Sequence, residues 1–426
     1  MLAMLCVAAT GACRDVTGDG SDAPAVDTVS APGFEAAGIG TSRAVLIGRA
    51  LPLRVEGWYG GSAGANYDSV PGVFWKSSDP GVLKVGAGSA MALRAGSVML
   101  TARKGTWTDS VRVDVLSTGY AVTYLGTLGG SYSRAIDLND AGQVVGNATD
   151  AAGTIRAFRW TAGVITGLDR PPLQDGSALI DARGRVAGTP ELPGPPGAVV
   201  TTVNDSGTIA GYWQVANSRD SAFVLRDGSV HRLPLSGRCG TGEAVPSSQI
   251  WDITSINNGV EVIGDGLAFS CYHAADVFHW SGSGLLDFPA GNSAAPWIRA
   301  TALNDAGTFL VEYQTSPARA KATHLGSVIQ SGVERRLSAI PQFQDVLPRD
   351  LNEKNQVVGM ADFFNDTSLH GFLWLGSGPA DLSLLTKDGS WTILEANAIN
   401  ESGQIAGVAL NTRTGQRGAV LLTPAP

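Results

Sequence analysis

The chain has 426 residues, of which 44% are hydrophobic and 16% are charged, and its formal net charge is −8. The apolar content excludes an intrinsically disordered chain, and the acidic balance, with 30 Lys and Arg spread along the sequence, argues against a nucleic-acid-binding protein. The 55 glycines, together with the lack of any sustained helical periodicity, predict a turn-rich, all-β protein.

The first segment, residues 1–13, is short and apolar, and it ends in Thr10-Gly11-Ala12-Cys13. Small residues before a cysteine resemble the lipobox of bacterial lipoproteins, in which the cysteine is acylated after the signal peptide is removed. The resemblance implies export, lipidation of Cys13, and contact with a membrane through this lipid anchor only. No later stretch is apolar over the roughly 18 residues that a spanning helix needs.

Residues 14–33 are rich in Gly, Asp, Ser, Ala and Pro and hold almost no large apolar side chain, which is typical of a flexible tether. Three acidic residues in this segment, Asp15, Asp19 and Asp22, invite a comparison with a calcium loop. Such a loop also needs a closing bidentate Glu, which is absent, so we expect no metal here.

Residues 34–117 contain short alternating runs such as Val82-Leu83-Lys84-Val85 and Val111–Val115, which predict a β-sandwich. The segments Phe74–Val85 and Ala92–Ala102 resemble the bacterial Ig-like domain of group two. In that family the Trp, here Trp75, packs in the core. The resemblance implies a spacer or an adhesive module on a bacterial surface, and we expect a spacer.

Residues 118–426 repeat one motif, seen first in Leu138–Gly146: an apolar residue, Asn or Asp, small residues, Gly, and a Val/Ile pair. Each copy predicts a β-hairpin, because Asn and Gly favour the turn and the apolar residues begin and end the strands. We expect the turn side chains to bond their own backbone rather than a metal. The seven turn residues are Asn139, Asp181, Asn204, Asn257, Asn304, Asn352 and Asn400.

A second motif with Phe and Trp on one face, as in Phe158 and Trp160, follows most turns and predicts a third strand, and the apolar run after it predicts a fourth. The turn positions are 42, 23, 53, 47, 48 and 48 residues apart. Four strands in about 40 to 50 residues match one blade of a β-propeller. The short gap after Asp181 and the proline-rich stretch 190–196 predict a stunted unit, so we expect six full blades and a stunted one.

The ends of this region predict how the ring closes. The last repeat stops after its third strand at Leu421-Leu422, whereas the strand Ala121–Leu125 precedes the first turn without a partner of its own. We therefore expect the early strand to complete the last blade.

The segment Tyr124–Ala135, leading into Leu138–Gly146, resembles the signature of bacterial HAF repeats, a family of probable extracellular repeats. The His-Ala-Phe triplet of the family is represented by variants such as Arg156-Ala157-Phe158 and His370-Gly371-Phe372. The resemblance covers about residues 118–426 and implies a secreted, propeller-like fold. It supplies no catalytic residues.

Cys239 and Cys271 remain once the N-terminal cysteines are assigned to the signal and the lipid, and in an oxidising compartment we expect them to form a disulfide. Neither lies in a pattern typical of a zinc site. The five histidines include no His-Glu-x-x-His motif, and we expect His279 and His370 on the solvent face of their strands. No serine lies in a nucleophile motif.

Variation between the copies points to a binding site, because scaffold positions recur while ligand contacts need not. Five residues before the turns, the copies hold several charged residues, with aromatic and basic residues near them. In propellers the strand-entry loops converge around the central channel, where rings and charges suit a sugar or a peptide. The predicted ligand contacts are Tyr132, Arg134, Trp251, Asp252, Trp297, Arg299, Arg349 and Glu395.

The sequence thus predicts an all-β chain with an Ig-like β-sandwich and a six- or seven-bladed β-propeller. We expect a monomeric, non-catalytic binding or adhesion protein without a cofactor, exported to the cell surface or periplasm as an outer-membrane lipoprotein, with an extracellular glycan or protein ligand. The alternative is a carbohydrate-active enzyme, a glycoside hydrolase or lyase, with Asp252 and Glu395 as its carboxylates.

Overall fold

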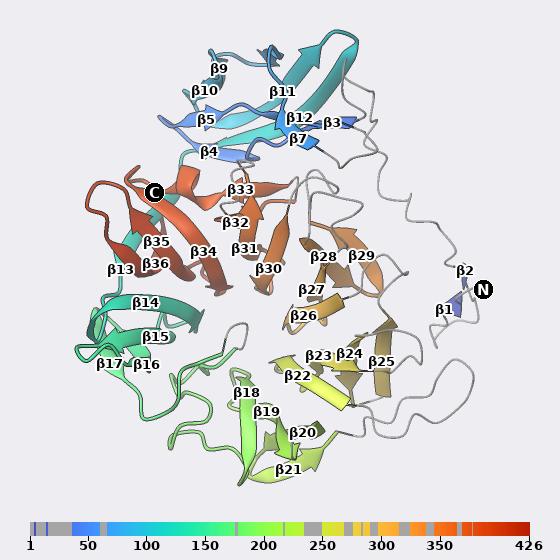
Figure 1. Cartoon of the computed structure of the whole chain (residues 1–426), viewed down its shortest axis with the longest axis vertical. Coiled ribbons are helices and arrows are strands. Elements are labelled where there is room, and N and C mark those ends of the chain that lie inside the picture. The colour runs from blue at the N-terminus through green and yellow to red at the C-terminus, as the bar shows by residue number, and fades with distance from the viewer. Residues whose placement is uncertain are drawn as a thin grey trace.

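The computed structural model describes residues 4–5, 14–15, 36–59, 66–174, 178–215, 218–233, 249–267, 276–282, 284–289, 297–314, 324–337, 345–363, 369–376 and 378–426. Throughout these ranges the regular structure is β, apart from one 3-10 helix, η1 (Leu382–Leu385) (Figure 1). The all-β prediction is confirmed. None of the described helical segments has the length and apolar character needed to cross a bilayer. Near the N-terminus β1 (Met4–Leu5) pairs with β2 (Arg14–Asp15).

The N-terminal unit is a β-sandwich built from three small sheets. The first sheet orders β4 (Ala44–Leu46), β12 (Trp107–Leu116), β11 (Gly96–Lys104) and β8 (Phe74–Ser77); the second orders β5 (Ala50–Pro52), β10 (Ser89–Ala92) and β9 (Leu83–Val85); the third orders β3 (Ala36–Ile39), β6 (Val55–Tyr59) and β7 (Asn66–Ser69). Trp107 is the fully buried tryptophan, whereas Trp75 is only partly buried and packs against the edges of two core clusters. Trp75 therefore packs against the core as expected but is not its central residue, because Trp107 is the tryptophan that is fully buried there.

Six four-stranded antiparallel sheets surround a central axis, each with its first strand innermost (Figure 1). We number them as blades around the ring and reserve the number 2 for the short unit described below. Blade 1 has β14 (Gly129–Leu138), β15 (Val144–Asp150), β16 (Ile155–Thr161) and β17 (Val164–Gly167); blade 3 has β18 (Ala198–Val203), β19 (Ile209–Val215), β20 (Ser218–Arg226) and β21 (Ser229–Arg232); blade 4 has β22 (Gln249–Ile256), β23 (Val262–Leu267), β24 (Asp276–Ser281) and β25 (Gly284–Pro289). Blade 5 has β26 (Trp297–Leu303), β27 (Phe309–Gln314), β28 (His324–Gln330) and β29 (Val333–Arg336); blade 6 has β30 (Val346–Leu351), β31 (Val357–Asp362), β32 (Leu369–Trp374) and β33 (Pro379–Asp381); blade 7 has β34 (Trp391–Ile399), β35 (Ile405–Asn411), β36 (Arg417–Ala425) and β13 (Gly119–Tyr124).

The ring closes in blade 7, which combines the two ends of the propeller sequence. Strand β13 pairs antiparallel with β36, with Val122 opposite Leu422 and Tyr124 opposite Val420. The predicted exchange of an early strand into the final blade is confirmed. Pairing the first strand with the last also removes two free strand edges.

Blade 2 is the stunted unit, residues 178–192, and no four-stranded sheet forms in it. Its pairings are two isolated bridges, Ile180 with Val186 and Ala187 with Leu192. Its apolar residues nevertheless pack in one buried cluster with Val145 of blade 1 and Phe223 of blade 3. The short unit therefore fills a blade position in the ring without a regular strand in residues 178–192, in keeping with the stunted unit that the 23-residue spacing predicts.

The two repeated motifs meet inside blades 1, 3, 4 and 6, where the Gly of the second strand pairs with the Phe of the third. A Cβ atom built on Gly146 would lie 2.1 Å from the carbonyl oxygen of Arg134 and 2.9 Å from the ring of Phe158. Gly146 pairs with Ala135 on one side and with Phe158 on the other, and a β-bulge follows Ala135. The Gly thus admits the close approach of the bulged inner strand, and the Phe covers it.

The sandwich is joined to blades 6 and 7 by backbone and side-chain contacts. Arg43 N–H donates to the Pro379 carbonyl at 3.1 Å, and the Asp381 N–H donates to the Ser42 hydroxyl at 3.0 Å. Ala44 lies in the same buried cluster as Leu385 of η1. These contacts hold the sandwich against the rim of the propeller.

Candidate functional site

Hydrogen bonds link the hairpin turns around one end of the central channel, with a gap between the turns of blades 2 and 3. The side-chain amide of each turn Asn donates to the backbone carbonyl of the turn residue in the next blade, with N···O distances between 2.9 and 3.3 Å. The six bonds run from Asn139 to Asp181, Asn204 to Asn257, Asn257 to Asn304, Asn304 to Asn352, Asn352 to Asn400 and Asn400 to Asn139. The side-chain oxygens meanwhile accept from their own turns, as predicted, for example from Gln143 N–H at 3.0 Å. The hydrogen bond from each side-chain NH2 group to the next blade was not predicted.

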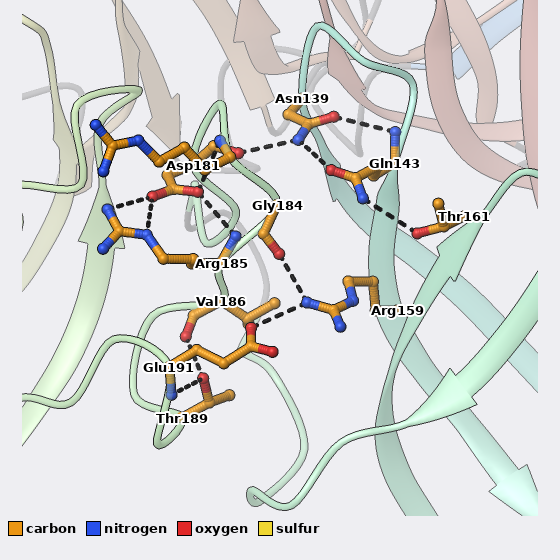
Figure 2. Close-up of polar contacts among 11 residues, drawn as sticks. Asn139, Gln143, Arg159, Thr161, Asp181, Gly184, Arg185, Val186, Thr189 and Glu191 are labelled. Carbon is orange, nitrogen blue, oxygen red and sulfur yellow. Dashed lines mark hydrogen bonds and ion pairs between the residues drawn. The ribbon is translucent and has the colours of Figure 1, made fainter.

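Blade 2 replaces this amide bond with an arginine (Figure 2). Asp181 has no side-chain donor, and its carboxylate binds the Arg185 guanidinium at 2.7 Å. The guanidinium lies directly against Gly207 of the blade 3 turn, where a Cβ would collide with its Nη2. On the other side, Arg159 of blade 1 donates to the Gly184 carbonyl at 2.8 Å and to Glu191 at 2.9 Å. An ion pair therefore fastens the short blade to blade 1, while on the side of blade 3 the Arg185 guanidinium, held by Asp181 of its own blade, packs against Gly207.

The residues that follow the turn Asn form an acidic rim, defined as Asp140, Asp205, Asp305, Glu353 and Glu401. Their carboxylates accept hydrogen bonds from the equivalent residue of a neighbouring blade, as when Glu401 N–H donates to Asp140 at 2.9 Å. Asn258 takes this place in blade 4 and donates to Asp205 and to Asp305. The acidic rim therefore reinforces the ring of turns.

The acidic rim lines a cavity of about 160 Å³ together with two further carboxylates, the buried Asp137 and the partly buried Asp350. Asp137 accepts from the N–H groups of Leu179 and Ile180 in blade 2, and Asp350 accepts from Ile399 N–H in blade 7 at 2.8 Å. Burial, which outweighs these hydrogen bonds, raises the pKa of Asp137 to about 6 and that of Asp350 to about 7. In the described ranges, no three His, Cys, Asp or Glu side chains are placed to hold a metal ion.

The predicted ligand contacts lie on the inner strands and divide into separate groups. Arg134 of blade 1 and Glu395 of blade 7 meet across the closing interface, with Nε and Oε2 2.6 Å apart. Tyr132 is exposed on β14. Trp251 and Trp297 belong to β22 and β26, and their side chains lie outside the described part of the structure, as do Cys13, Cys239 and Cys271.

Three of the predicted residues, Asp252, Arg299 and Arg349, share one ionisable cluster with residues that sequence reasoning missed. We call this the blade 4–6 cluster; its other members are Asp265, Glu312, His324 and Asp345. Arg299 Nε lies 3.7 Å from Asp265 Oδ2, and His324 Nδ1 lies 2.5 Å from Glu312 Oε1. The missed residues lie on second and third strands and just before β30. The prediction from sequence considered charged residues mainly at the position five residues before each turn, so it did not include them.

Burial is the main cause that raises the pKa of Asp265 to about 8, with smaller contributions from nearby Asp252 and Glu312, whereas the Ala300 N–H and Arg299 oppose the shift. The hydrogen bond to Glu312 is the main cause that raises the pKa of His324. The cluster therefore contains groups that change charge near neutral pH.

Asp265 has a structural counterpart in blade 1, because Asp265 and Asn147 both follow the Gly of the second strand. The Asn147 amide bonds both the N–H and the carbonyl of Leu173, and the Asp265 carboxylate accepts from Ala300 N–H in blade 5 at 2.7 Å. In both blades the residue after this Gly therefore forms a hydrogen bond to the segment that follows its own blade. The Asp265 carboxylate thus joins blade 4 to blade 5.

The histidine prediction is wrong. His279 is only 8% exposed, with its ring centroid 5.7 Å from that of Phe309 and Nε2 3.4 Å from Glu261 Oε2. His370 Nδ1 lies 3.0 Å from Asp381 Oδ2, and the Asp381 carboxylate is buried. In a propeller both faces of a blade pack against neighbouring blades, so strand alternation does not place one face in solvent.

Neither a scan against protein-family models nor a search of curated proteins finds a match. Similarity is found to solved structures: TolB from Acinetobacter baumannii has a TM-score of 0.30 at 9% identity, covering 77% of this chain, which spans 59% of TolB. A fucose-specific lectin from Aleuria aurantia has a TM-score of 0.30 at 17% identity, covering 72% of this chain and 99% of the lectin. A mutant of AofleA from Arthrobotrys oligospora has a TM-score of 0.30 at 13% identity, with 80% and 85% covered. The propeller architecture stands on the sheets and their closure described above.

Proposed function

We propose that this chain is a non-catalytic binding protein of the HAF-repeat type, exported and held at the cell surface or in the periplasm by a lipid on Cys13. Its Ig-like unit resembles group two of the bacterial Ig-like domains and positions the propeller. The proposed ligand is an extracellular glycan, with a protein ligand as the second possibility, and the protein acts as a monomer without a cofactor.

The observation that supports binding is the blade 4–6 cluster. In the ring of turns, donors and acceptors are used between blades. Arg299, in contrast, keeps 41% of its side chain exposed beside Asp265, and the His324 side chain is 31% exposed. Partly exposed donors and acceptors held by a rigid sheet suit the hydroxyl groups of a sugar, which need both.

The test uses the purified full chain on immobilised bacterial cell-wall and capsular polysaccharides. Retention is expected for the wild-type chain, with a loss of at least about tenfold in affinity for the double variant Arg299→Ala and Arg349→Ala. Arg335→Ala is the matched control, since Arg335 is exposed on β29, the outer strand of blade 5. Equal loss in the control, or no retention of any polysaccharide, would contradict a glycan site at the blade 4–6 cluster.

The enzyme alternative is favoured by one observation, the closeness of Asp252 to a carboxylate, Asp265, whose pKa is about 8. A raised pKa is typical of the general acid in glycoside hydrolysis. The expected pair of Asp252 and Glu395 is not brought together: Glu395 binds Arg134 and Asn397 in blades 1 and 7. Release of reducing ends from a retained polysaccharide, abolished in Asp252→Asn, would establish the enzyme and overturn the non-catalytic proposal.

A further inference from the structure

The missing outer half of blade 2 leaves a cavity of about 320 Å³ between blade 1 and blade 3. This volume is in the range of small-molecule sites. One wall comes from the segment that leaves blade 1, another from β18, and blade 2 supplies the remainder. The residues that matter to the argument are Arg170, Pro172, Leu179, Pro195, Val199 and Thr201.

Among the described residues that line this cavity, Arg170 is the one with a charged side chain. Its Nη1 donates to the Ala187 carbonyl, and its Nε is buried without a hydrogen-bond partner in the described structure. Burial lowers the pKa of Arg170, and no acidic residue in the described part of the chain counteracts this effect. The guanidinium therefore loses solvation without receiving a counter-ion from the described residues.

Two neighbouring arginines show that this absence is specific to Arg170. Arg159 binds Glu191 at 2.9 Å, and Arg185 binds Asp181 at 2.7 Å. The first pair joins blade 1 to blade 2, and the second lies within blade 2. A partly buried arginine without a carboxylate is costly unless an anion completes it, because the charged group is desolvated.

The surroundings of the guanidinium limit what that anion can be. Gly188 lies beside it, and a Cβ there would be 3.5 Å from Nη1 and would occupy a positive φ of +74°. The cavity lining also includes Pro172, Pro195 and Val199, which are apolar, beside the polar Gln174 and Thr201. A planar carboxylate matches the guanidinium fork, and apolar walls favour an apolar body behind it.

We propose that the cavity at blade 2 binds a small organic carboxylate with an apolar body, through an ion pair with Arg170. The site is independent of the blade 4–6 cluster, so it stands or falls separately from the proposed glycan site.

The experiment is isothermal titration of the full chain with three probes: benzoate, benzamide and acetate. Benzoate combines the charge with an apolar ring, benzamide keeps the ring without the charge, and acetate keeps the charge without the ring. Benzoate is expected to bind at least about tenfold more tightly than either. Comparable binding of benzamide or acetate, or no binding of benzoate, would overturn the proposal.

Variants test the role of Arg170. Arg170→Ala and Arg170→Lys are expected to weaken benzoate binding at least about tenfold, the lysine because it lacks the planar fork. Arg183→Ala is the control, because Arg183 is exposed on the same short blade. Circular dichroism checks that each variant is folded. Unchanged affinity in a folded Arg170→Ala variant would assign benzoate to another site and contradict the inference.

Discussion

At the scale of single residues, the turn asparagine has two roles, and the sequence predicted one. Its side-chain oxygen caps its own turn, which follows from the local Asn-x-x-Gly chemistry. Its amide donates to the next blade, and that bond exists only when seven units close into a ring. A local motif carries no information about a partner some 50 residues away, so the second role had to come from the structure.

The donor role predicts the effect of one substitution. Asn352→Asp keeps the oxygen that caps the turn but removes the donor to the Asn400 carbonyl at 3.1 Å. The free energy of unfolding is expected to fall by about 1–3 kcal/mol, since a buried acceptor loses its partner. Urea denaturation measures the change.

Asn411→Asp is the matched control, because the Asn411 oxygen also caps a turn, in blade 7, while its amide makes one long 3.4 Å contact to Ser390 within the same blade. A change below about 0.5 kcal/mol is expected there. Equal effects of the two substitutions would show that the inter-blade donor contributes nothing.

Three carboxylates whose pKa is raised by burial predict how stability depends on pH. Asp137, Asp350 and Asp265 have folded-state pKa values of about 6, 7 and 8, all above the ordinary 3.8. Between pH 4 and pH 8 the folded protein therefore keeps protons that the unfolded chain has released. The free energy of unfolding should fall as the pH rises through this window, by about 1.4 kcal/mol per pH unit for each group that is protonated only when folded.

Denaturation at pH 5 and at pH 8 measures this effect, with the higher stability expected at pH 5. The lowered pKa values of Asp150 and Asp388 act below pH 4 and leave this window unaffected. Asp265→Asn should reduce the pH dependence between pH 5 and pH 8. A protein that is more stable at pH 8 than at pH 5 would contradict the assigned protonation states.

At the scale of elements, the repeated Gly and Phe depend on each other, because the Phe ring packs over the space that the Gly leaves open. The sequence showed both motifs and their spacing, and the structure shows that they are neighbours across two strands. Blade 5 confirms the coupling, because it has Val311 in place of the Gly and Ser327 in place of the Phe. A larger residue in one strand is thus matched by a smaller one in the next.

This coupling predicts the effect of Gly264→Ala in blade 4. The new Cβ would lie 2.2 Å from the Asp252 carbonyl oxygen and 2.8 Å from the Phe278 ring, so the inner strand must shift. A loss of about 3 kcal/mol in the free energy of unfolding is expected, as for overpacking in a core. Thermal and urea denaturation measure it.

The control for this substitution is Gly282→Ala in the same blade, where no atom lies within 4 Å of the added Cβ. It should change stability by less than about 0.5 kcal/mol. If Gly264→Ala is as harmless as the control, the close approach of the bulged strand is not maintained in solution.

Element-level reasoning failed where the partner was a different blade. The charged positions before the turns did mark Asp252, Arg299 and Arg349, which the structure places in one cluster. The structure also pairs Arg134 with Glu395 and buries His279 against Phe309, and neither contact was predicted. Period-two alternation gives the two faces of a strand, but the neighbouring blade decides which of them meets solvent.

At the scale of the whole molecule, blade spacing and the unmatched end strands were sufficient to predict the ring, including its stunted unit. The docking of the sandwich was not predictable, because its contacts use backbone groups of Arg43, Pro379 and Asp381 and a single serine hydroxyl, that of Ser42, none of which stands out in the sequence. The sandwich was expected as a spacer, and its contacts hold it against blades 6 and 7. These contacts fix the orientation of the propeller relative to the sandwich.

The closure of the ring by β13 is the central claim, and one cross-linking measurement tests it most directly. Ala121 and Thr423 are directly opposite partners on β13 and β36. In the double variant Ala121→Cys and Thr423→Cys, oxidation should give a disulfide between peptides from the two ends of the propeller, identified by mass spectrometry. The control pair Thr101→Cys and Ser110→Cys joins neighbouring strands of one hairpin, where the two hydroxyls are 2.8 Å apart. A disulfide in both variants is the predicted result, whereas one in the hairpin control alone would contradict the closed ring.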